Sequence, residues 1–278
     1  MTGEASGARS AAMEVFSHAT SVRARTADIF DAEVSSEWTI MGRPSGGYLL
    51  ALLGRAALTL AGSGHVLAGS AHYVRSPLPG PVEVEGELLR RGRSVSQVRT
   101  RMSQGGRLCL EALMSLGELD SSAVPRWDGG VPDSQPVSFG ECIRLAPVTP
   151  DGLRASIFDQ VEARLDPESA GLALGRPSGR GQVCGWLKLP GGESFDPVSL
   201  LYAVDAFPPP TLDTNFNAMA ATVELTAYIR AVPAPGPVWI AGRARLIDHQ
   251  CADEVFDVWD VTGRLVAHAT QLVMVPPN

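Results

Sequence analysis

The chain of 278 residues has few residues of the kinds that build metal sites, disulfides or membrane anchors. Its four cysteines are widely scattered and form no CxxC pair, and no histidine stands near them at the spacing of zinc ligands. We therefore expect no metal, no other cofactor and a reducing, cytoplasmic compartment. The N-terminus lacks the apolar core of a signal peptide, and no uncharged run approaches the length of a transmembrane helix.

Lysine is almost absent. It occurs once, at Lys188, while arginine supplies the other positive charges, and the formal net charge is −7 at pH 7. Long-range attraction to nucleic acid or to an anionic membrane surface is therefore not expected. No phosphate-binding loop or GxGxxG occurs in a suitable strand–helix context, and no serine stands in a GxSxG elbow. Nucleotide-dependent and serine-hydrolase mechanisms thus have little support.

The chain does contain one pattern twice. Residues 80–94 read GPVEVEGELLRRGRS and residues 236–250 read GPVWIAGRARLIDHQ, an offset of 156 positions. A second pair follows, GGRLCLEALMSL over 105–116 and TGRLVAHATQLV over 262–273, with an offset of 157. Two separate alignments that agree within one residue indicate a duplicated domain rather than a short solenoid repeat.

In each half, an apolar helical run precedes segments with the two-residue period of strands. Leucines and alanines at three- and four-residue steps predict a helix over 46–60. Asp196, an acidic N-cap followed by proline, predicts the start of a second helix that must end by Pro208. Short strands are predicted before the helices, over 36–40 and 157–165.

Between the halves, residues 121–148 lose this periodicity and gain Ser, Pro, Gly and Asp, which is typical of a linker. The chain therefore divides into an N-terminal repeat, 1–120, and a C-terminal repeat, 149–278. Helices followed by runs of strands, without alternating βαβ units, indicate an α+β class. A broadly apolar helix is most simply wrapped by the sheet that follows it. Two such units form a double hotdog, with both helices side by side at the centre of one continuous sheet.

Several strings in a fixed order carry a family resemblance. The first half contains RPSGGYLLALLGRAAL, SAHYVRSPLPGP and ELLRRGRSVSQVRTRMSQGGRLCLEAL, and the second contains YAVDAFPPP, AATVELTAYIR and GRLVAHATQLVM. In their order and spacing they resemble the type II acyl-CoA thioesterases, a tandem-hotdog family, over nearly the whole chain. The resemblance implies hydrolysis of an acyl thioester, carried by coenzyme A or by an acyl-carrier protein.

The resemblance also implies a water-activating trio in the second hotdog, which falls on Asp205, Thr222 and Gln271. Two of these residues have support from their own pattern. Asp205 shares the apolar face of its predicted helix, and Gln271 interrupts an apolar strand face. A polar group on a buried face is costly unless it is partnered or used. The structural alternatives are a carboxylate turned to solvent and a glutamine that binds a loop carbonyl.

The first repeat carries different residues at these three positions: Arg55, Met114 and, in a looser alignment, Val66. An arginine cannot act as a base near neutral pH, and a methionine is only a weak acceptor. We therefore expect one competent site per chain, in the second repeat.

Two further groups are candidate binding residues. Gly46 and Gly47 begin the first predicted helix, whose terminal N–H groups favour developing negative charge, so they are candidate oxyanion donors. A tight entry turn alone is the other explanation for two glycines. Arg91 and Arg93 stand at a hairpin turn and are candidate contacts for coenzyme A phosphates, or else a solvated hairpin tip. The chain is compatible with a homo-oligomer.

Two other functions stay open at this point. A hotdog hydratase or dehydratase of enoyl thioesters needs an Asp–His pair at the helix and its entry loop, and no histidine stands near Asp205 in the sequence. A duplicated hotdog that only binds acyl thioesters would have the same fold. The retained trio favours the hydrolase.

Overall fold

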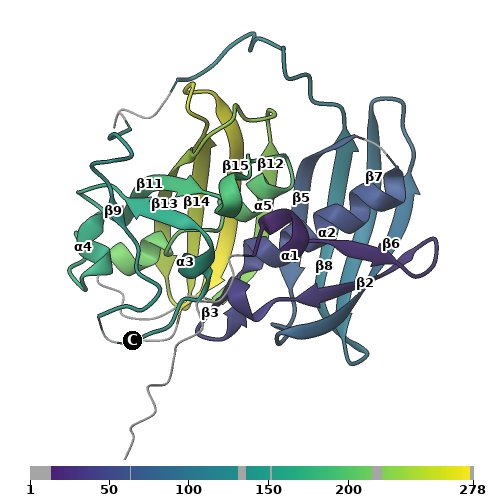
Figure 1. Cartoon of the computed structure of the whole chain (residues 1–278), viewed down its shortest axis with the longest axis horizontal. Helices are drawn as coiled ribbons and strands as arrows, with labels where there is room; N and C mark the ends of the chain where they lie inside the picture. Colours follow the sequence, from purple (N-terminus) through teal and green to yellow (C-terminus); the bar gives the residue numbers. More distant parts are fainter. Residues whose placement is uncertain (1–13, 63, 131–135, 151, 215–220, 276–278) are drawn as a thin grey trace, which may run out of the picture.

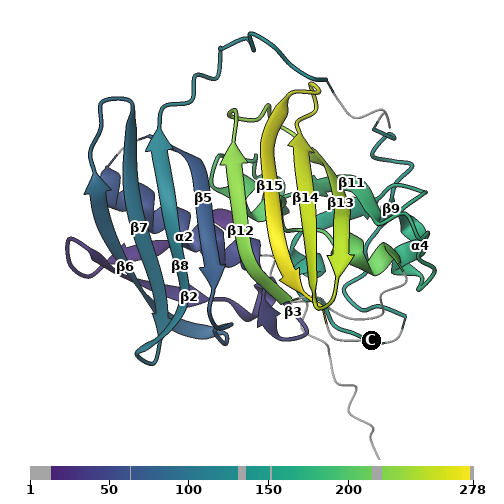
Figure 2. The same ribbon diagram turned by 180° about the vertical axis from the view of Figure 1, so that it is seen from behind.

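The computed structural model describes residues 14–62, 64–130, 136–150, 152–214 and 221–275. Their dominant feature is one antiparallel sheet of 13 strands, and helices α2 and α5 lie together on one side of it (Figure 1). From behind, the central strands lie side by side with the helices beyond them (Figure 2). This is the predicted double hotdog of α+β class.

The order of strands repeats in mirror image about the middle of the sheet. The first half gives the order β1-β2-β6-β7-β8-β5 and the second gives β12-β15-β14-β13-β11-β10-β9. The first set comprises β1 Val22–Ala24, β2 Ile29–Val34, β5 His65–Tyr73, β6 Gly80–Arg90, β7 Val95–Gln104 and β8 Arg107–Gly117. The second comprises β9 Ile143–Arg144, β10 Glu162–Leu165, β11 Gln182–Lys188, β12 Ala221–Ile229, β13 Val238–Asp248, β14 Cys251–Trp259 and β15 Leu265–Met274. Since β5 pairs with β12, the two halves share one continuous sheet, as predicted.

The helices are fewer and mostly short. They are α1 Phe16–Ala19, α2 Gly46–Ala61, α3 Ile157–Gln160, α4 Ala170–Ala173 and α5 Ser199–Ala203, with 3₁₀ turns η1 Ser36–Trp38, η2 Pro190–Gly192 and η3 Pro210–Thr214. A separate ribbon pairs β3 Thr39–Ile40 with β4 Arg43–Pro44. Helix α2 matches the predicted helix over 46–60. Ser45 caps its start and Gly62, in the left-handed region, caps its end.

A hydrogen bond that occurs in both halves supports the duplication at atomic level. The Gln104 side chain accepts the N–H of Leu78 at 2.8 Å, and the Asp260 side chain accepts the N–H of Ala234 at 2.9 Å. Donor and acceptor are both displaced by 156 positions, the offset found between the sequence repeats. The same loop is therefore tied to the same strand end in each half.

Helices α2 and α5 pack against each other in antiparallel directions. A Cβ added to Gly47, at the start of α2, would meet the carbonyl oxygens of Leu201 and Tyr202 at the end of α5. Further along α2, a Cβ at Gly54 would meet the side chain of Leu201 at 2.9 Å and that of Val198 at 3.8 Å. The two helices thus lie side by side at the centre, as predicted, and glycines allow their close approach.

Two predicted strands were wrong in part. Residues 36–40 form η1 and only then β3, because the Ser35 side chain accepts the N–H of Glu37 and starts a turn. Residues 157–165 form α3 followed by β10. The apolar pair Ile157–Phe158 is buried in a helical turn, and a short apolar run fits either structure.

The second helix begins two residues later than predicted, at Ser199, and is shorter. The Asp196 carboxylate accepts the N–H of Ser199 at 2.6 Å, and the Ser199 hydroxyl accepts the N–H of Asp196 at 2.7 Å, a reciprocal cap. Regular helix ends at Ala203, since the N–H of Asp205 bonds to the carbonyl of Tyr202, three residues earlier. The last turn is tightened in this way before the prolines that follow.

None of the helices in the described ranges is both long and apolar enough to cross a membrane. Residues 1–13, on which the expectation of no signal peptide rests, lie outside the described residues. Strand β9 falls within the segment 121–148 that the sequence predicts as a linker.

Candidate active site

Asp205 lies just beyond α5 and binds the start of α2. Its Oδ2 accepts the backbone N–H of Gly47 at 2.7 Å and the hydroxyl of Ser45 at 3.4 Å. The carboxylate of the second half is therefore held by the helix start of the first. The partial positive charge at a helix N-terminus favours an anion at this place.

Gly47 is required for this contact. A Cβ at this position would lie 2.8 Å from the Cβ of Asp205 and 2.9 Å from the carbonyl oxygen of Leu201. At Gly46 an added Cβ would lie 3.2 Å from Asp205 Oδ2 and as close to the ring of Tyr73, whose hydroxyl donates to the Gly46 carbonyl at 2.9 Å. The predicted glycine pair thus adjoins Asp205. In this structure the Gly47 N–H binds the carboxylate, and its role as an oxyanion donor stays a prediction.

The surroundings of Asp205 make it a stronger base than an ordinary aspartate. Burial raises the pKa of its carboxyl from 3.8 to about 6, against the lowering effect of the Gly47 N–H. The negative charge of Glu254 raises this pKa further, and the Ser45 hydroxyl lowers it. Near neutral pH the group is ionised, yet it takes up a proton more readily than a solvated carboxylate.

Thr222 and Gln271 meet on the inner face of the sheet. A bulge between Thr222 and Glu224 interrupts β12, at the position where β5 has a bulge in the first half. The Thr222 hydroxyl donates to Gln271 Oε1 at 3.4 Å. Gln271 is buried on β15, as its place in the apolar alternation predicts, and its Nε2 donates to Glu254 Oε2 at 2.7 Å.

Glu254 is a buried carboxylate that the sequence reasoning missed. It lies on β14 directly opposite Gln271 and is fully buried. Its other oxygen accepts the N–H of Thr211 at 2.9 Å. Burial raises its pKa, and the hydrogen bonds from Thr211 and Gln271 oppose that rise. The sequence did indicate a buried position for Glu254, because it alternates with Ala252 and Phe256 on one face of the strand, as Gln271 does with its apolar neighbours.

The predicted catalytic residues and glycines form two clusters, one where the end of α5 meets the start of α2 and one on strands β12 and β15. Asp205 joins Gly46 and Gly47, while Thr222 joins Gln271. No hydrogen bond between these described residues links Asp205 directly to Thr222 or Gln271. The charge of Glu254 acts on the pKa of Asp205, so the two carboxyl groups lie within electrostatic range of each other.

Arg91 and Arg93 lie elsewhere. Both are exposed near the turn between β6 and β7, and Arg91 Nη1 donates to the carbonyl of Ala61 at 3.1 Å. Ala61 is the last residue of α2 and Gly47 the second. At the helical rise, the two ends are about 20 Å apart. The structure does not bring these arginines to the Asp205 cluster, and their contact with coenzyme A phosphates stays a prediction.

A second contact between the same two helices, at the start of α5 and in the second half of α2, carries an ion pair instead. Arg55 Nη2 of α2 lies 2.9 Å from Oδ2 of Asp196, which caps α5. Asp205 reaches from the end of α5 to the cap of α2 in the same way. The corresponding sheet positions, Val66 and Met114, are buried and apolar. The arrangement of a carboxylate bound to a helix-start N–H, with a polar pair on the adjoining strands, is therefore found at one of the two junctions.

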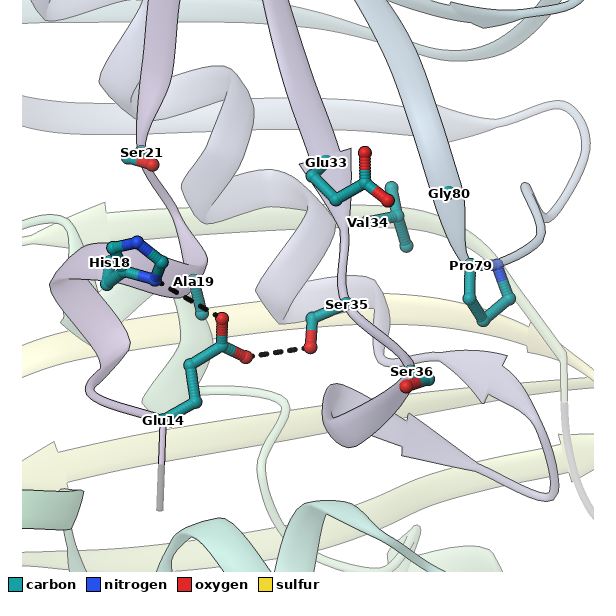
Figure 3. A pocket seen from close by; sticks show the side chains of 10 residues that line it. All are labelled: Glu14, His18, Ala19, Ser21, Glu33, Val34, Ser35, Ser36, Pro79 and Gly80. Carbon is teal, nitrogen blue, oxygen red and sulfur yellow. Dashed lines mark hydrogen bonds and ion pairs between the residues drawn. The ribbon is translucent and has the colours of Figure 1, made fainter. Parts of the chain in front are cut away.

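A cavity of about 450 Å³ lies apart from these residues, between α1, the end of β2 and the start of β6 (Figure 3). Its lining comprises Glu14, His18, Ala19, Ser21, Glu33, Val34, Ser35, Ser36, Pro79 and Gly80. Two carboxylates, Glu14 and Glu33, make it acidic, which disfavours the phosphates of coenzyme A. None of the predicted site residues lines it.

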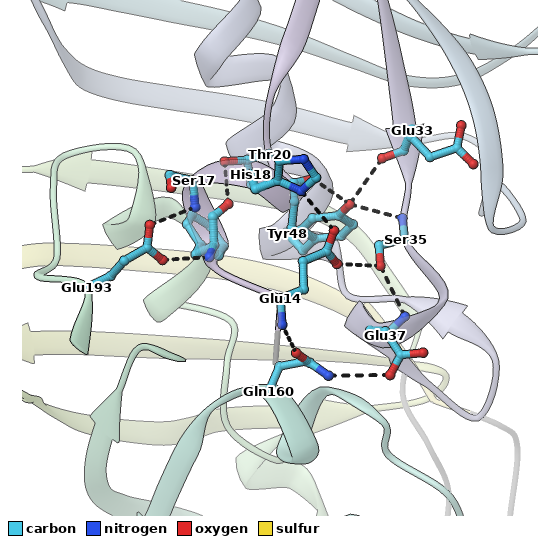
Figure 4. A network of polar contacts seen from close by, with 12 residues as sticks. Glu14, Ser17, His18, Thr20, Glu33, Ser35, Glu37, Tyr48, Gln160 and Glu193 are labelled. Carbon is cyan, nitrogen blue, oxygen red and sulfur yellow. Dashed lines mark hydrogen bonds and ion pairs between the residues drawn. The ribbon is translucent and has the colours of Figure 1, made fainter. Parts of the chain in front are cut away.

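A polar network beside this cavity fixes the beginning of α2 (Figure 4). Gln160, from the second half, accepts the N–H of Glu14 at 2.7 Å and donates to Glu37 at 3.3 Å. The hydroxyl of Tyr48, next to Gly47, donates to the carbonyl of Ala19 at 2.9 Å. The Gln160 bonds connect the two halves, and the Tyr48 bond fixes the helix start that holds Asp205 within the first half.

Metal chemistry has no ligand set in the described part of the chain, where no group of three or more His, Cys, Asp or Glu side chains could hold an ion. The four cysteines are free.

Comparison with known proteins adds the family context. Residues 34–117 match the model of the acyl-CoA thioesterase N-terminal domain, and residues 139–275 match that of the acyl-CoA thioesterase C-terminal domain. An uncharacterized protein of Mycobacterium tuberculosis (strain ATCC 25618 / H37Rv) is 31% identical over 273 residues, covering 89% of this chain and 91% of that protein.

Solved structures agree. A candidate thioesterase II from Thermobifida fusca YX superposes with a TM-score of 0.86 at 33% identity, covering 95% of this chain and 98% of that one. A conserved protein with a hot dog fold from Alicyclobacillus acidocaldarius gives a TM-score of 0.80 at 22% identity, with coverage of 95% and 98%. The second likeness concerns the fold alone.

Proposed function

Because this chain belongs to the acyl-CoA thioesterase family and is a thioesterase, we propose that Asp205, Thr222 and Gln271 activate the water that hydrolyses its substrate. The observation that carries the proposal is the Asp205 carboxylate, bound to a helix start and with its pKa raised to about 6. The water oxygen attacks the acyl carbon and the C–S bond breaks. A carboxylic acid and a free thiol leave.

Asp205 is the general base of this proposal. Both of its hydrogen-bond donors, Gly47 and Ser45, contact Oδ2. Among the described residues none donates a hydrogen bond to Oδ1. We assign Oδ1 as the oxygen that takes the proton from water, while Oδ2 keeps the carboxylate in place.

Thr222 and Gln271 hold and orient the water. Their hydrogen bond on the inner face of the sheet supports this role, because it presents a hydroxyl with free acceptor capacity beside a buried amide. The oxyanion of the tetrahedral intermediate is assigned to the N–H groups of Gly46 and Gly47 at the start of α2. Asp205 loses its negative charge when it takes the proton from water, which weakens its hold on the Gly47 N–H as the oxyanion forms. A helix N-terminus stabilises developing negative charge.

One site per chain is proposed, in the second repeat and completed by the first. At the other helix junction Arg55 pairs with Asp196, and Met114 replaces the amide. We also propose the boundaries 1–120, 121–148 and 149–278 for the two repeats and their linker. The four free cysteines favour the cytoplasm as compartment.

The substrate is an acyl thioester. We propose coenzyme A as the carrier, with Arg91 and Arg93 as phosphate contacts, and an acyl-carrier protein as the alternative. The test is a panel of acyl-CoA, enoyl-CoA and acyl-carrier thioesters, in which free thiol and water addition are measured separately. Release of thiol from acyl-CoA supports the proposal. Hydration of enoyl-CoA without thiol, or tight binding without turnover, would refute it.

A further inference from the structure

The inner face of the second half contains a carboxylate that the hydrolysis proposed above does not yet use. Glu254 is fully buried, and its two oxygens have different partners. Oε1 accepts the backbone N–H of Thr211 at 2.9 Å and Oε2 accepts Nε2 of Gln271 at 2.7 Å. A buried charge with so few polar partners is costly to a fold.

The fold does not require a carboxylate at this position. Glu254 and Gln271 are direct cross-strand partners, and the corresponding partners in the first half are Val98 and Met114. Both members of that apolar pair are buried. The same sheet position is thus filled by two apolar side chains in the half without Asp205, and by a carboxylate and an amide in the half that has it.

The carboxylate sets the direction of the hydrogen bonds beyond it. A carboxylate oxygen accepts, so Gln271 must turn its NH₂ group toward Glu254. Its carbonyl oxygen then faces Thr222, whose hydroxyl donates to it at 3.4 Å. With its hydrogen used in this way, the Thr222 oxygen presents lone pairs to any water beside it.

We propose that Glu254 is a positioning residue for hydrolysis, which fixes the amide of Gln271 so that Thr222 accepts a hydrogen bond from the attacking water. The inference rests on the proposed function. A water that donates one hydrogen to Thr222 and the other to Asp205 keeps its own lone pair for the acyl carbon. A water that accepts from Thr222 has one of its two lone pairs engaged and loses an acceptor for one hydrogen, which makes it a weaker nucleophile.

The E254Q substitution keeps the shape of the side chain but replaces one acceptor oxygen with an NH₂ group that donates hydrogen bonds. Its amide oxygen stays with Thr211, whose backbone N–H can only donate, so its NH₂ group faces Gln271. Gln271 must then turn its carbonyl oxygen to the new donor and its NH₂ group to Thr222. The T222V substitution removes the hydroxyl through which this reversal acts, so in a T222V background the E254Q substitution has no hydrogen bond to Thr222 left to reverse.

The experiment measures kcat and KM for thiol release by wild type, E254Q, T222V, E254Q/T222V and D205N, together with melting temperature. We expect E254Q to lower kcat at least about tenfold relative to wild type, with KM within about twofold, and to change the kcat of T222V by about twofold or less. A mere packing role predicts the same loss in both backgrounds. An E254Q variant as fast as wild type, or a loss of about tenfold in both backgrounds, would overturn the inference.

The remaining outcomes are also decisive. If E254Q does not fold, E254V, which carries the residue type of the corresponding Val98, is compared in the wild-type and T222V backgrounds in the same way. A loss of about tenfold confined to the wild-type background supports the inference, and an equal effect in both backgrounds overturns it. D205N separates the two proposals. A slow D205N with a fast E254Q removes the role of Glu254 only, whereas a D205N as fast as wild type removes the proposed base itself.

Discussion

Asp205→Asn should stabilise the protein, and more so at high pH. The carboxyl pKa rises from 3.8 to about 6 on folding, so the folded state prefers the protonated form. The contribution of Asp205 to the free energy of unfolding therefore falls as pH rises from about 4 to about 6 and stays low above that. Asparagine does not titrate and retains an oxygen for the Gly47 N–H. Between low and high pH, the difference in free energy of unfolding between D205N and wild type should change by about 3 kcal/mol.

The assay is urea unfolding of wild type and D205N at several pH values between about 4 and about 8. The free-energy difference between the two proteins should grow with pH and level off above about 7. Thr222→Val is the control, because it changes the same site without a titrating group, and its difference from wild type should not follow this curve. A D205N difference that is constant over the whole range would refute the raised pKa.

Three further outcomes are expected. Gly47→Ala should lower the free energy of unfolding by about 1–3 kcal/mol and slow turnover, because the added Cβ would lie within 3 Å of backbone oxygens and of Asp205. Gly140→Ala is the control: an added Cβ there meets nothing within 4 Å, so melting temperature and activity should not change. Arg55→Ala should leave kcat for thiol release within about twofold of wild type. It should lower the free energy of unfolding by at most about 1 kcal/mol, since the ion pair with Asp196 is partly exposed. Loss of turnover in a folded variant would contradict the single site. The ratio kcat/KM should fall about tenfold per pH unit below about 6, and a profile flat down to pH 5 would exclude Asp205 as the base.

The duplication and the fold were predictable because they rest on patterns that repeat along the chain. The offset of 156 between the repeats reappears in the loop ties made by Gln104 and Asp260. Helix α2 was predictable from its apolar period. The turn at Ser36 and helix α3 were not, since side-chain caps and tertiary burial decided between helix and strand over short segments.

The candidate site was only partly predictable. Asp205 and Gln271 stood out as polar groups on apolar faces. The structure holds Asp205 by a hydrogen bond at the junction of the two central helices, and Gln271 by a hydrogen bond to Glu254 on the neighbouring strand. That the Gly47 N–H binds Asp205 depends on the antiparallel packing of α2 and α5, which no local pattern specifies. Glu254 interrupts an apolar strand face as Gln271 does, but the family resemblance does not point to it.

The central claim is that Asp205 supplies the base for thioester hydrolysis. The most direct measurement is the rate of thiol release from a saturating acyl-CoA by D205N and wild type near pH 8, with circular dichroism to verify folding. The account predicts that D205N is folded and that its kcat is lower by about 10²–10⁴-fold. A folded D205N that turns over within a few-fold of wild type would contradict it.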